Sequence, residues 1–300
     1  MRHVTIAAAA YPLDWAGDWA AYAAKTRAWV QMAALKKADL LVFPEYAAME
    51  LASLGGAEVA ADLSRAVAEV LHHRAAMERH FEGLAIEFGL YILAPSGPAQ
   101  DGYDLRNRAV LFGPSGRIGH QDKAIMTRFE REDWTIGPGR GLTLFDTGIG
   151  KIGIVICYDS EFPLLSRALC EAGAEILLAP SCTDAAAGYN RVRIGAQARA
   201  LENQCVTVQA PVVGLAPWCP AVDENHGAAG IYGPPDAGWP DDGVLAIGGY
   251  DEPGWVVATV DLDRVTHSRR DGSVLLFQHW SEQPLQAVQI RTVAESPRKS

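Results

Sequence analysis

The sequence lacks the features that mark membrane proteins and nucleic-acid binders. It has no uninterrupted apolar run near the roughly 20 residues that a membrane-spanning helix needs. The apolar stretch in MRHVTIAAAAYPLDW is short, and no convincing signal-peptide cleavage site follows it, so we predict a first strand there. The chain also lacks an excess of positive charge, since its formal net charge is -10. A basic surface is what meets phosphates, so we expect neither nucleic-acid nor membrane partners.

Cysteine is scarce and follows no pattern. The chain has 5 cysteines, an odd number whose spacing fits neither a disulfide framework nor a zinc site. We therefore expect free thiols, a cytoplasmic location and no metal site. The histidines do not change this expectation, because His72, His73 and His80 lack the spacing of metal ligands and are predicted to lie on a solvated helix face.

Strand-like and helix-like segments alternate through most of the 300 residues. Short apolar runs predict strands at 4–10, 39–45, 89–96, 174–181 and 205–214, with strand pairs at 108–119 and 142–157. Helical spacing predicts helices at 19–38, 58–88, 163–173 and 191–204. This mixture predicts an α/β fold with large sheets. We expect residues 1–280 to form a single domain and the polar residues 281–300 to form a C-terminal tail.

One apolar run, KIGIVIC, ends on Cys157 just before a turn and a helix. Free cysteine is among the most buried residue types, so a core thiol is one interpretation. The other is a nucleophile, because a strand, a turn and then a helix resemble the nucleophile elbow of other hydrolases. Pro163 suits the first turn of that helix, whose N-terminus would favour a thiolate. The remaining cysteines are predicted to be structural: Cys170, Cys182, Cys205 and Cys219.

Two other apolar runs end on groups that a cysteine nucleophile would need. Glu45 closes DLLVFPE, where a buried carboxylate is costly unless it has a partner or a task, although it could also cap a helix. Lys123 closes GRIGHQDK and alone would be an ordinary solvated lysine. A nucleophile requires a base and a group that stabilises the oxyanion. A carboxylate and an ammonium would supply both.

Together, FPEY, QDKAIM and ICYDSEFP resemble the three catalytic signatures of the nitrilase, or carbon–nitrogen hydrolase, superfamily. The order fits, and so does the spacing of 78 residues from Glu45 to Lys123 and 34 from there to Cys157. FEREDWTIGPG similarly places Glu130 seven residues before Gly137, where the family's second glutamate often stands. The resemblance covers about residues 3–263. It implies a four-layer αββα sandwich, no cofactor, and a homodimer or higher homo-oligomer that the C-terminal tail often contacts.

The same resemblance implies hydrolysis of a small-molecule amide through a cysteine thioester. Cys157 would attack the carbonyl carbon, and Glu45 would act as general base and then general acid. Lys123 and the backbone N–H of Tyr158 would stabilise the oxyanion. Glu130 would hydrogen-bond Lys123 or position substrate and water.

The sequence constrains the substrate less tightly. Branches of the family that bind substrate carboxylates often carry arginine four residues after the nucleophile, where this chain has Glu161. This counts against N-carbamoyl-D-amino acids and ω-amides of keto acids, and it favours neutral or cationic substrates. The alternative is that Glu161 pairs internally with Arg167 or Arg191. Other candidate substrate contacts are Tyr158, Trp134, Trp218, Ser181, Asp184, Tyr189 and Asn190.

Other functions remain open. We favour an amidase over a nitrilase, because nitrile hydrolysis commonly follows Cys-Trp-Glu rather than the Cys-Tyr-Asp found here; an N-carbamoyl-amine amidohydrolase would use the same triad. A thiol redox protein would need a resolving cysteine close to Cys157, for which Cys170 and Cys182 are the candidates. That function would not explain Glu45 and Lys123. A non-enzymatic interaction protein would not need the intact triad.

Overall fold

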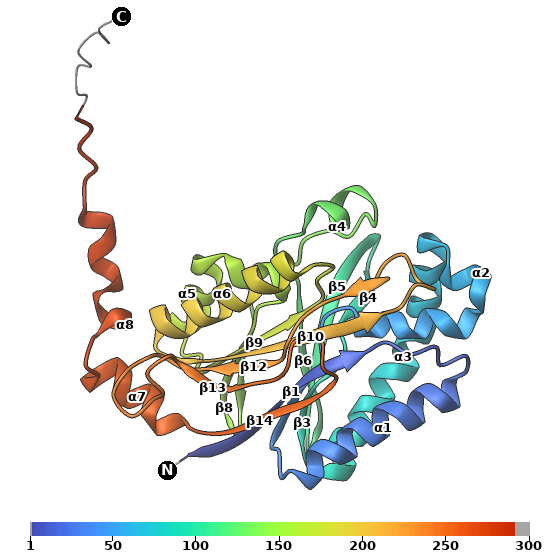
Figure 1. The fold of residues 1–300 in the computed structure, drawn as a ribbon, viewed down its shortest axis with the longest axis horizontal. Coiled ribbons are helices and arrows are strands. Elements are labelled where there is room, and N and C mark those ends of the chain that lie inside the picture. Colours follow the sequence, from blue (N-terminus) through green and yellow to red (C-terminus); the bar gives the residue numbers. More distant parts are fainter. Residues whose placement is uncertain (1, 292–300) are drawn as a thin grey trace, which may run out of the picture.

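Two β-sheets face each other at the centre of the molecule, and each carries helices on its outer side (Figure 1). The computed structural model describes residues 2–291. The strands of the first sheet are β1 (His3–Pro12), β2 (Leu40–Val42), β3 (Tyr91–Leu93), β4 (Gly97–Asp101), β5 (Asp104–Gly113), β6 (Gly116–Asp122) and β14 (Gly254–Asp261). Those of the second are β7 (Leu144–Thr147), β8 (Gly150–Ile154), β9 (Ile176–Ser181), β10 (Val206–Leu215), β11 (Glu224–Asn225), β12 (Gly230–Tyr232) and β13 (Val244–Ile247). The two sheets are continuous with each other, because the ends of β1 and β10 pair in parallel.

Side chains of the central strands divide between two apolar layers. In β1, Ile6 packs in the layer between the sheets, whereas Ala7 packs in the layer under the helices. In β9, Leu178 and Leu177 divide in the same way. Neighbouring residues of a strand point to opposite faces, so a strand covered on both faces is apolar throughout. This is why the strands were visible in the sequence as unbroken apolar runs.

Four long helices form the two outer layers and confirm the predicted αββα sandwich. On one side lie α1 (Trp19–Leu35) and α3 (Leu63–Phe88), and on the other lie α5 (Pro163–Glu171) and α6 (Ala186–Asn203) (Figure 1). Side chains cap the first pair, since Asp18 accepts the backbone N–H of Ala21 and Asp62 accepts that of Arg65. The predicted segment 58–88 is split into α2 (Ala57–Ala60) and α3.

Strand direction decides where the site lies. β8, β9, β10, β1, β2 and β3 are parallel to one another. β5 is antiparallel to β3, and β6 is antiparallel to β5, so β6 runs in the same direction as the parallel group. The carboxyl ends of β2, β6, β8 and β9 therefore lie at the same edge of the sandwich. The segments that follow these four strands carry the candidate site.

Several short elements were not predicted. They are η1 (Ala47–Gly55), α4 (Arg128–Glu132), η2 (Cys157–Glu161), α7 (Leu262–Asp271), α8 (Leu276–His279) and η3 (Trp280–Leu285). Residues 286–291, which follow η3, extend away from the sandwich (Figure 1). Residues 292–300 of the predicted tail lie outside the described residues, so the boundary at 280 and any dimer contact of the tail stay predictions. Among residues 2–291, no helix is both long and apolar enough to cross a bilayer.

Candidate active site

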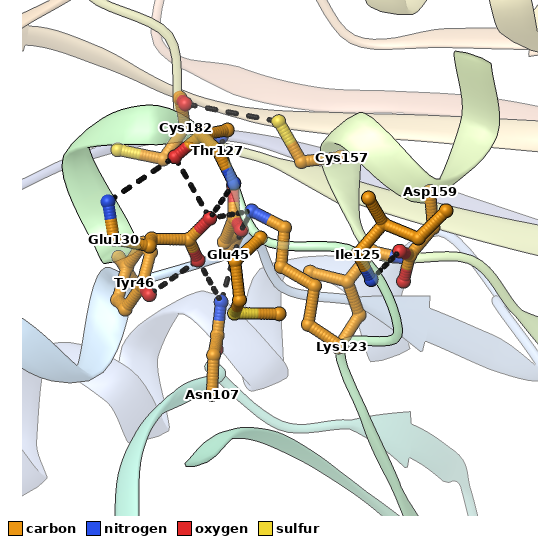
Figure 2. A network of polar contacts seen from close by, with 12 residues as sticks. Glu45, Tyr46, Asn107, Lys123, Ile125, Thr127, Glu130, Cys157, Asp159 and Cys182 are labelled. Atoms are coloured by element: carbon orange, nitrogen blue, oxygen red, sulfur yellow. Dashed lines mark hydrogen bonds and ion pairs between the residues drawn. The ribbon is translucent and has the colours of Figure 1, made fainter. Parts of the chain in front are cut away.

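Glu45, Lys123, Glu130 and Cys157 lie together at the shared strand edge (Figure 2). Glu45 follows β2, Lys123 follows β6 directly, and Cys157 follows β8. The Lys123 Nζ donates to Glu45 Oε1 at 2.8 Å and to Glu130 Oε2 at 2.7 Å. All four side chains are buried. The structure thus brings together the four residues that the sequence selected.

Lys123 is held cationic by its two carboxylate neighbours. Burial on its own would lower the pKa of the ammonium, since a charged group loses hydration. Glu45 and Glu130 more than offset this, so the pKa of Lys123 lies well above its ordinary value. Lys123 is therefore a permanent positive charge in the site and does not act as a base.

The two carboxylates differ in the pKa that their surroundings impose. Burial raises the pKa of Glu45 to about 7; Lys123 opposes that rise and Glu130 reinforces it. Burial also acts to raise the pKa of Glu130, but the attraction of Lys123 and hydrogen bonds from Tyr46 and Thr127 lower it overall. Glu130 is thus ionised at neutral pH, whereas Glu45 can both accept and release a proton there.

A local motif explains why Glu130 is so well held. It is the third residue of α4, and it forms a capping box with Thr127, whose backbone N–H donates to Glu130 Oε2 at 2.8 Å. The Tyr46 hydroxyl donates to the other carboxylate oxygen at 2.6 Å. These contacts fix the carboxylate that faces Lys123.

Cys157 does not end the strand, as the sequence suggested, but opens the one-turn helix η2. β8 stops at Ile154, and Cys157 has φ 50°, in the left-handed region that non-glycine residues seldom adopt. Burial raises the pKa of the Cys157 thiol well above its ordinary value; Glu45 raises it further, and Lys123 lowers it. The expectation that the start of the next helix would favour a thiolate was therefore wrong, because burial has the largest effect on the pKa of this thiol. A neutral thiol needs a base.

Asp159, a residue that the sequence analysis did not select, joins the lysine segment to the nucleophile turn. Its buried carboxylate accepts backbone N–H groups from Ala124 at 3.0 Å, Ile125 at 2.8 Å and Ile156 at 3.2 Å. Burial raises its pKa to about 6, and the backbone donors oppose that rise. Asp159 thereby fixes the chain on either side of the site. Residue type alone could not reveal partners 34 and 35 residues away.

A cavity of about 390 Å³ opens above the thiol. Four of the predicted substrate contacts line it: Trp134, Tyr158, Glu161 and Asp184. Its lining also includes Phe129, Thr183, Ala221, Asp223, Glu224 and Asn225. A more open cavity of about 510 Å³ near Lys151 and Arg269 contains no cysteine. Among residues 2–291, no group of three His, Cys, Asp or Glu side chains could hold a metal ion.

The other predicted contacts lie outside the cavity lining. Ser181 is buried at the end of β9, and the ring of Tyr189 packs 5.4 Å from that of Tyr250. The Asn190 side chain is exposed on α6 and donates to the carbonyl of Ala186. The Trp218 ring packs against Trp15 instead of facing the thiol.

Glu161 has an internal partner. Its carboxylate lies 3.5 Å from the Arg191 guanidinium, whereas Arg167 pairs with Glu171. Burial raises the pKa of Glu161, and Arg191 opposes that rise. Of the two internal partners that the sequence offered, Arg167 and Arg191, the structure pairs Glu161 with Arg191. Both members of the pair line the cavity, so the pair still forms part of its wall.

Solved structures with the same fold are hydrolases of the nitrilase superfamily. The carbon-nitrogen hydrolase of Helicobacter pylori G27 superposes with a TM-score of 0.72, at 19% identity over 90% of this chain and 92% of that one. Saccharomyces cerevisiae Nit3 gives 0.69 at 18% identity, over 90% and 94%. An amidase from Nesterenkonia sp. AN1, with the acetamide moiety of fluoroacetamide added to its active-site cysteine, gives 0.64 at 22% identity, over 90% and 94%. Identities this low establish the fold.

Sequence comparison establishes the family. The carbon-nitrogen hydrolase family model matches residues 5–270, and the chain belongs to that family. The probable hydrolase YhcX of Bacillus subtilis (strain 168) is 34% identical over 253 residues, which are 84% of this chain and 49% of YhcX. The deaminated glutathione amidase of Yersinia enterocolitica is 33% identical over 155 residues, 48% of this chain and 54% of that one. The chain thus spans about half the length of these relatives.

Proposed function

We propose that this chain hydrolyses the carbon–nitrogen bond of a linear amide through a thioester on Cys157. The observation that carries the proposal is the buried trio itself. A neutral thiol lies in one site with a carboxylate whose pKa is about 7 and with a lysine held cationic. These are the nucleophile, the base and the oxyanion partner that amide hydrolysis requires. The relatives and solved structures that are named as amidases support it.

In the first half of the reaction, Cys157 Sγ bonds to the carbonyl carbon while Glu45 takes the thiol proton. The carbonyl electron pair moves onto oxygen, where the Lys123 ammonium and the Tyr158 N–H stabilise the negative charge. When the tetrahedral intermediate collapses, the carbon–nitrogen bond breaks and Glu45 passes its proton to the leaving nitrogen. Ammonia or an amine departs and a thioester remains.

In the second half, water replaces the amine. Glu45 accepts a proton from water as the oxygen bonds to the thioester carbon, and the same two donors stabilise the second oxyanion. The carbon–sulfur bond then breaks, the proton returns to the thiol, and the carboxylic acid leaves. Glu130 keeps the Lys123 ammonium in place through both steps.

The pH dependence follows from the two shifted pKa values. Activity requires ionised Glu45, so kcat/KM is expected to rise with pH through a limb near 7, where the pKa of Glu45 lies. No loss is expected until strongly alkaline pH, because the thiol pKa is raised well above its ordinary value. A rate profile measured across this range tests the assignment. A limb at the ordinary glutamate value of 4.5 would show that burial does not raise the pKa of Glu45, and a profile without an acid limb would show that Glu45 is not the base.

The experiment that tests the function is an ammonia-release screen across amides, nitriles and N-carbamoyl amines. Intact-protein mass spectrometry should accompany it, with an acyl adduct on Cys157 as the expected result. Release of ammonia from nitriles alone would support a nitrilase, and release from carbamoyl compounds alone would support an N-carbamoyl-amine amidohydrolase. A chain that releases nothing, yet loses its Cys157 thiol reversibly on treatment with peroxide, would support the redox alternative.

The charges of the cavity wall favour a neutral or cationic substrate. Glu161, Asp184, Asp223 and Glu224 line the cavity, whereas the cations besides Lys123 are Arg128 and Arg191. Arg191 pairs with Glu161, and Arg128 pairs with Glu132 outside the lining. The wall therefore carries more carboxylates than cations, and it should repel a substrate anion.

A series of amides with matched length tests this preference. We expect kcat/KM for the cationic δ-aminovaleramide to exceed that for neutral hexanamide, and the anionic glutaramate to fall about tenfold below hexanamide. Added salt should narrow the differences, since it screens charge. Asp184→Asn should narrow them too, with the hexanamide rate as its internal control. A preference for glutaramate would contradict the proposal.

The assembly and the compartment are also proposals. Leu164 of α5 and Ile194 of α6 are exposed apolar side chains on the outer helices, which supports a homodimer formed through that face. Light scattering of the protein in solution would test it. All five cysteines are free, which fits a reducing compartment such as the cytoplasm.

A further inference from the structure

Asn107 is a buried residue of β5 that contacts Glu45, Lys123 and Glu130 (Figure 2). Its backbone carbonyl accepts the N–H of Lys123 at 2.9 Å. Its side-chain Nδ2 donates to Glu45 Oε1 at 2.9 Å and reaches Glu130 Oε1 at 3.5 Å. Its Oδ1 accepts the hydroxyl of Ser96 at 2.8 Å. No other described side chain donates to both carboxylates except that of Lys123.

The network determines which way the amide faces. The Ser96 oxygen accepts the backbone N–H of Tyr46, so its own hydrogen is free for Asn107 Oδ1. The ionised carboxylate on the other side can only accept, so it must meet the NH₂ group. The amide therefore links the segment after Glu45 to the carboxylates themselves.

The donors are unequally divided between the two oxygens of Glu45. Oε1 accepts from both Lys123 Nζ and Asn107 Nδ2. Oε2 accepts from the backbone N–H of Cys182 at 3.0 Å. The carbonyl of the same Cys182 accepts from the thiol, with Cys157 Sγ 3.8 Å away. Cys182 therefore lies beside both the thiol and Oε2, and Oε2 retains a free lone pair.

We infer that Asn107 is a positioning residue that occupies Glu45 Oε1, so that Oε2 alone exchanges the proton with Cys157. This inference rests on the proposed role of Glu45 as the base. Without the amide, Oε1 would keep Lys123 as its one donor, and the carboxylate would lose a donor that favours its ionised form. Asn107 does not line the cavity, so substrate binding should be little affected by its loss.

The test follows the alkylation of Cys157 by iodoacetamide as a function of pH, read by peptide mass spectrometry, alongside amide turnover. In the unaltered chain, the alkylation rate should rise through a limb near 7, where the pKa of Glu45 lies. Asn107→Ala should move this limb upward by about one pH unit, because an acceptor loses a donor that favours its charged form. It should also lower kcat by roughly tenfold or more and leave KM unchanged.

Asn203→Ala is the matched control. Asn203 is equally buried, and its side chain donates to the carbonyl of Arg199 in α6, away from the site. Its loss should change stability and leave the pH limb of alkylation in place, so both variants are also compared by thermal unfolding. Asn107→Asp keeps the shape of the side chain but replaces the donating NH₂ with an oxygen. It is the variant to measure if Asn107→Ala fails to fold. It should move the limb upward at least as far, since a third carboxyl adds repulsion.

Two negative outcomes separate the inference from the proposed function. An alkylation limb near 7 that Asn107→Ala and Asn107→Asp leave in place overturns the positioning role, even if turnover falls. An unaltered chain whose alkylation rate shows no acid limb below the titration of the thiol itself shows that Glu45 is not the base, and then the proposed function itself fails.

Discussion

Cys157→Ala is expected to yield a folded protein whose amide hydrolysis is lost by roughly four orders of magnitude or more. The reason is chemical, because no other described group near Glu45 is placed as a nucleophile. Cys182 also lines the cavity, but its thiol donates to Asn225 Oδ1 at 3.2 Å. Alanine keeps a Cβ at the left-handed φ of residue 157, so the turn is no more strained than before. Turnover of the best substrate and thermal unfolding measure the two halves of this prediction.

Cys170→Ala is the matched control for a buried thiol. Cys170 packs between α5 and the second sheet, with its sulfur 4.0 Å from that of Cys205. Its removal should lower stability by about 1–2 kcal/mol and leave kcat unchanged. A fully active Cys157→Ala protein would refute the mechanism, whatever happened to the control.

Lys123→Met is expected to remove both activity and much of the stability. It leaves Glu45 and Glu130 as buried carboxylates without the ammonium that both of them contact. Breaking a buried ion pair by removing one partner costs about 3–5 kcal/mol. The oxyanion would also lose its cationic partner, which should lower kcat by roughly a hundredfold or more. Urea unfolding and steady-state rates measure the two effects.

The stability loss should depend on pH in a definite direction. Without the ammonium, the pKa values of Glu45 and Glu130 in the folded state rise. A carboxyl whose folded-state pKa is raised lowers the free energy of unfolding as pH increases from its unfolded-state pKa to its folded-state pKa. The deficit relative to the unaltered chain should therefore be smallest near about pH 5 and largest near about pH 8. Lys36→Met, on an exposed lysine, should change stability by less than about 0.5 kcal/mol at either pH. A deficit independent of pH would contradict the role assigned to the two carboxylates.

The sequence predicted the layers of the fold because buried parallel strands and long helices have strong apolar patterns. β1, β9 and β10 were found within a few residues of their bounds. β4, with the sequence GPAQD, has neither an apolar run nor alternation, so nothing local predicts a strand. The five-residue helix α4 is too short to show periodicity, although the capping box formed by Thr127 and Glu130 could have marked its start.

Part of the site was predicted from a family resemblance and not from apolar patterns. Resemblance to a family selected Glu45, Lys123, Glu130 and Cys157, and the structure places them together. The supporting residues were missed because they act through distant backbone or side-chain atoms: Asp159 through the lysine segment and Asn107 through Glu45, 62 residues away. The thiolate prediction failed because burial has the largest effect on the pKa of Cys157. The local sequence does not determine how deeply this side chain is buried.

The position of Lys123 between two carboxylates has a consequence for how much the protein must rearrange during the proposed reaction. Before attack at a pH where Glu45 is ionised, the buried group holds one positive and two negative charges. After attack, Glu45 is neutral and the substrate oxygen is negative, so the total is the same. The reaction moves one negative charge from one neighbour of a fixed ammonium to another. The groups of the protein interior cannot reorient around a new charge as water molecules do. Because the total charge of the site stays the same, they do not need to.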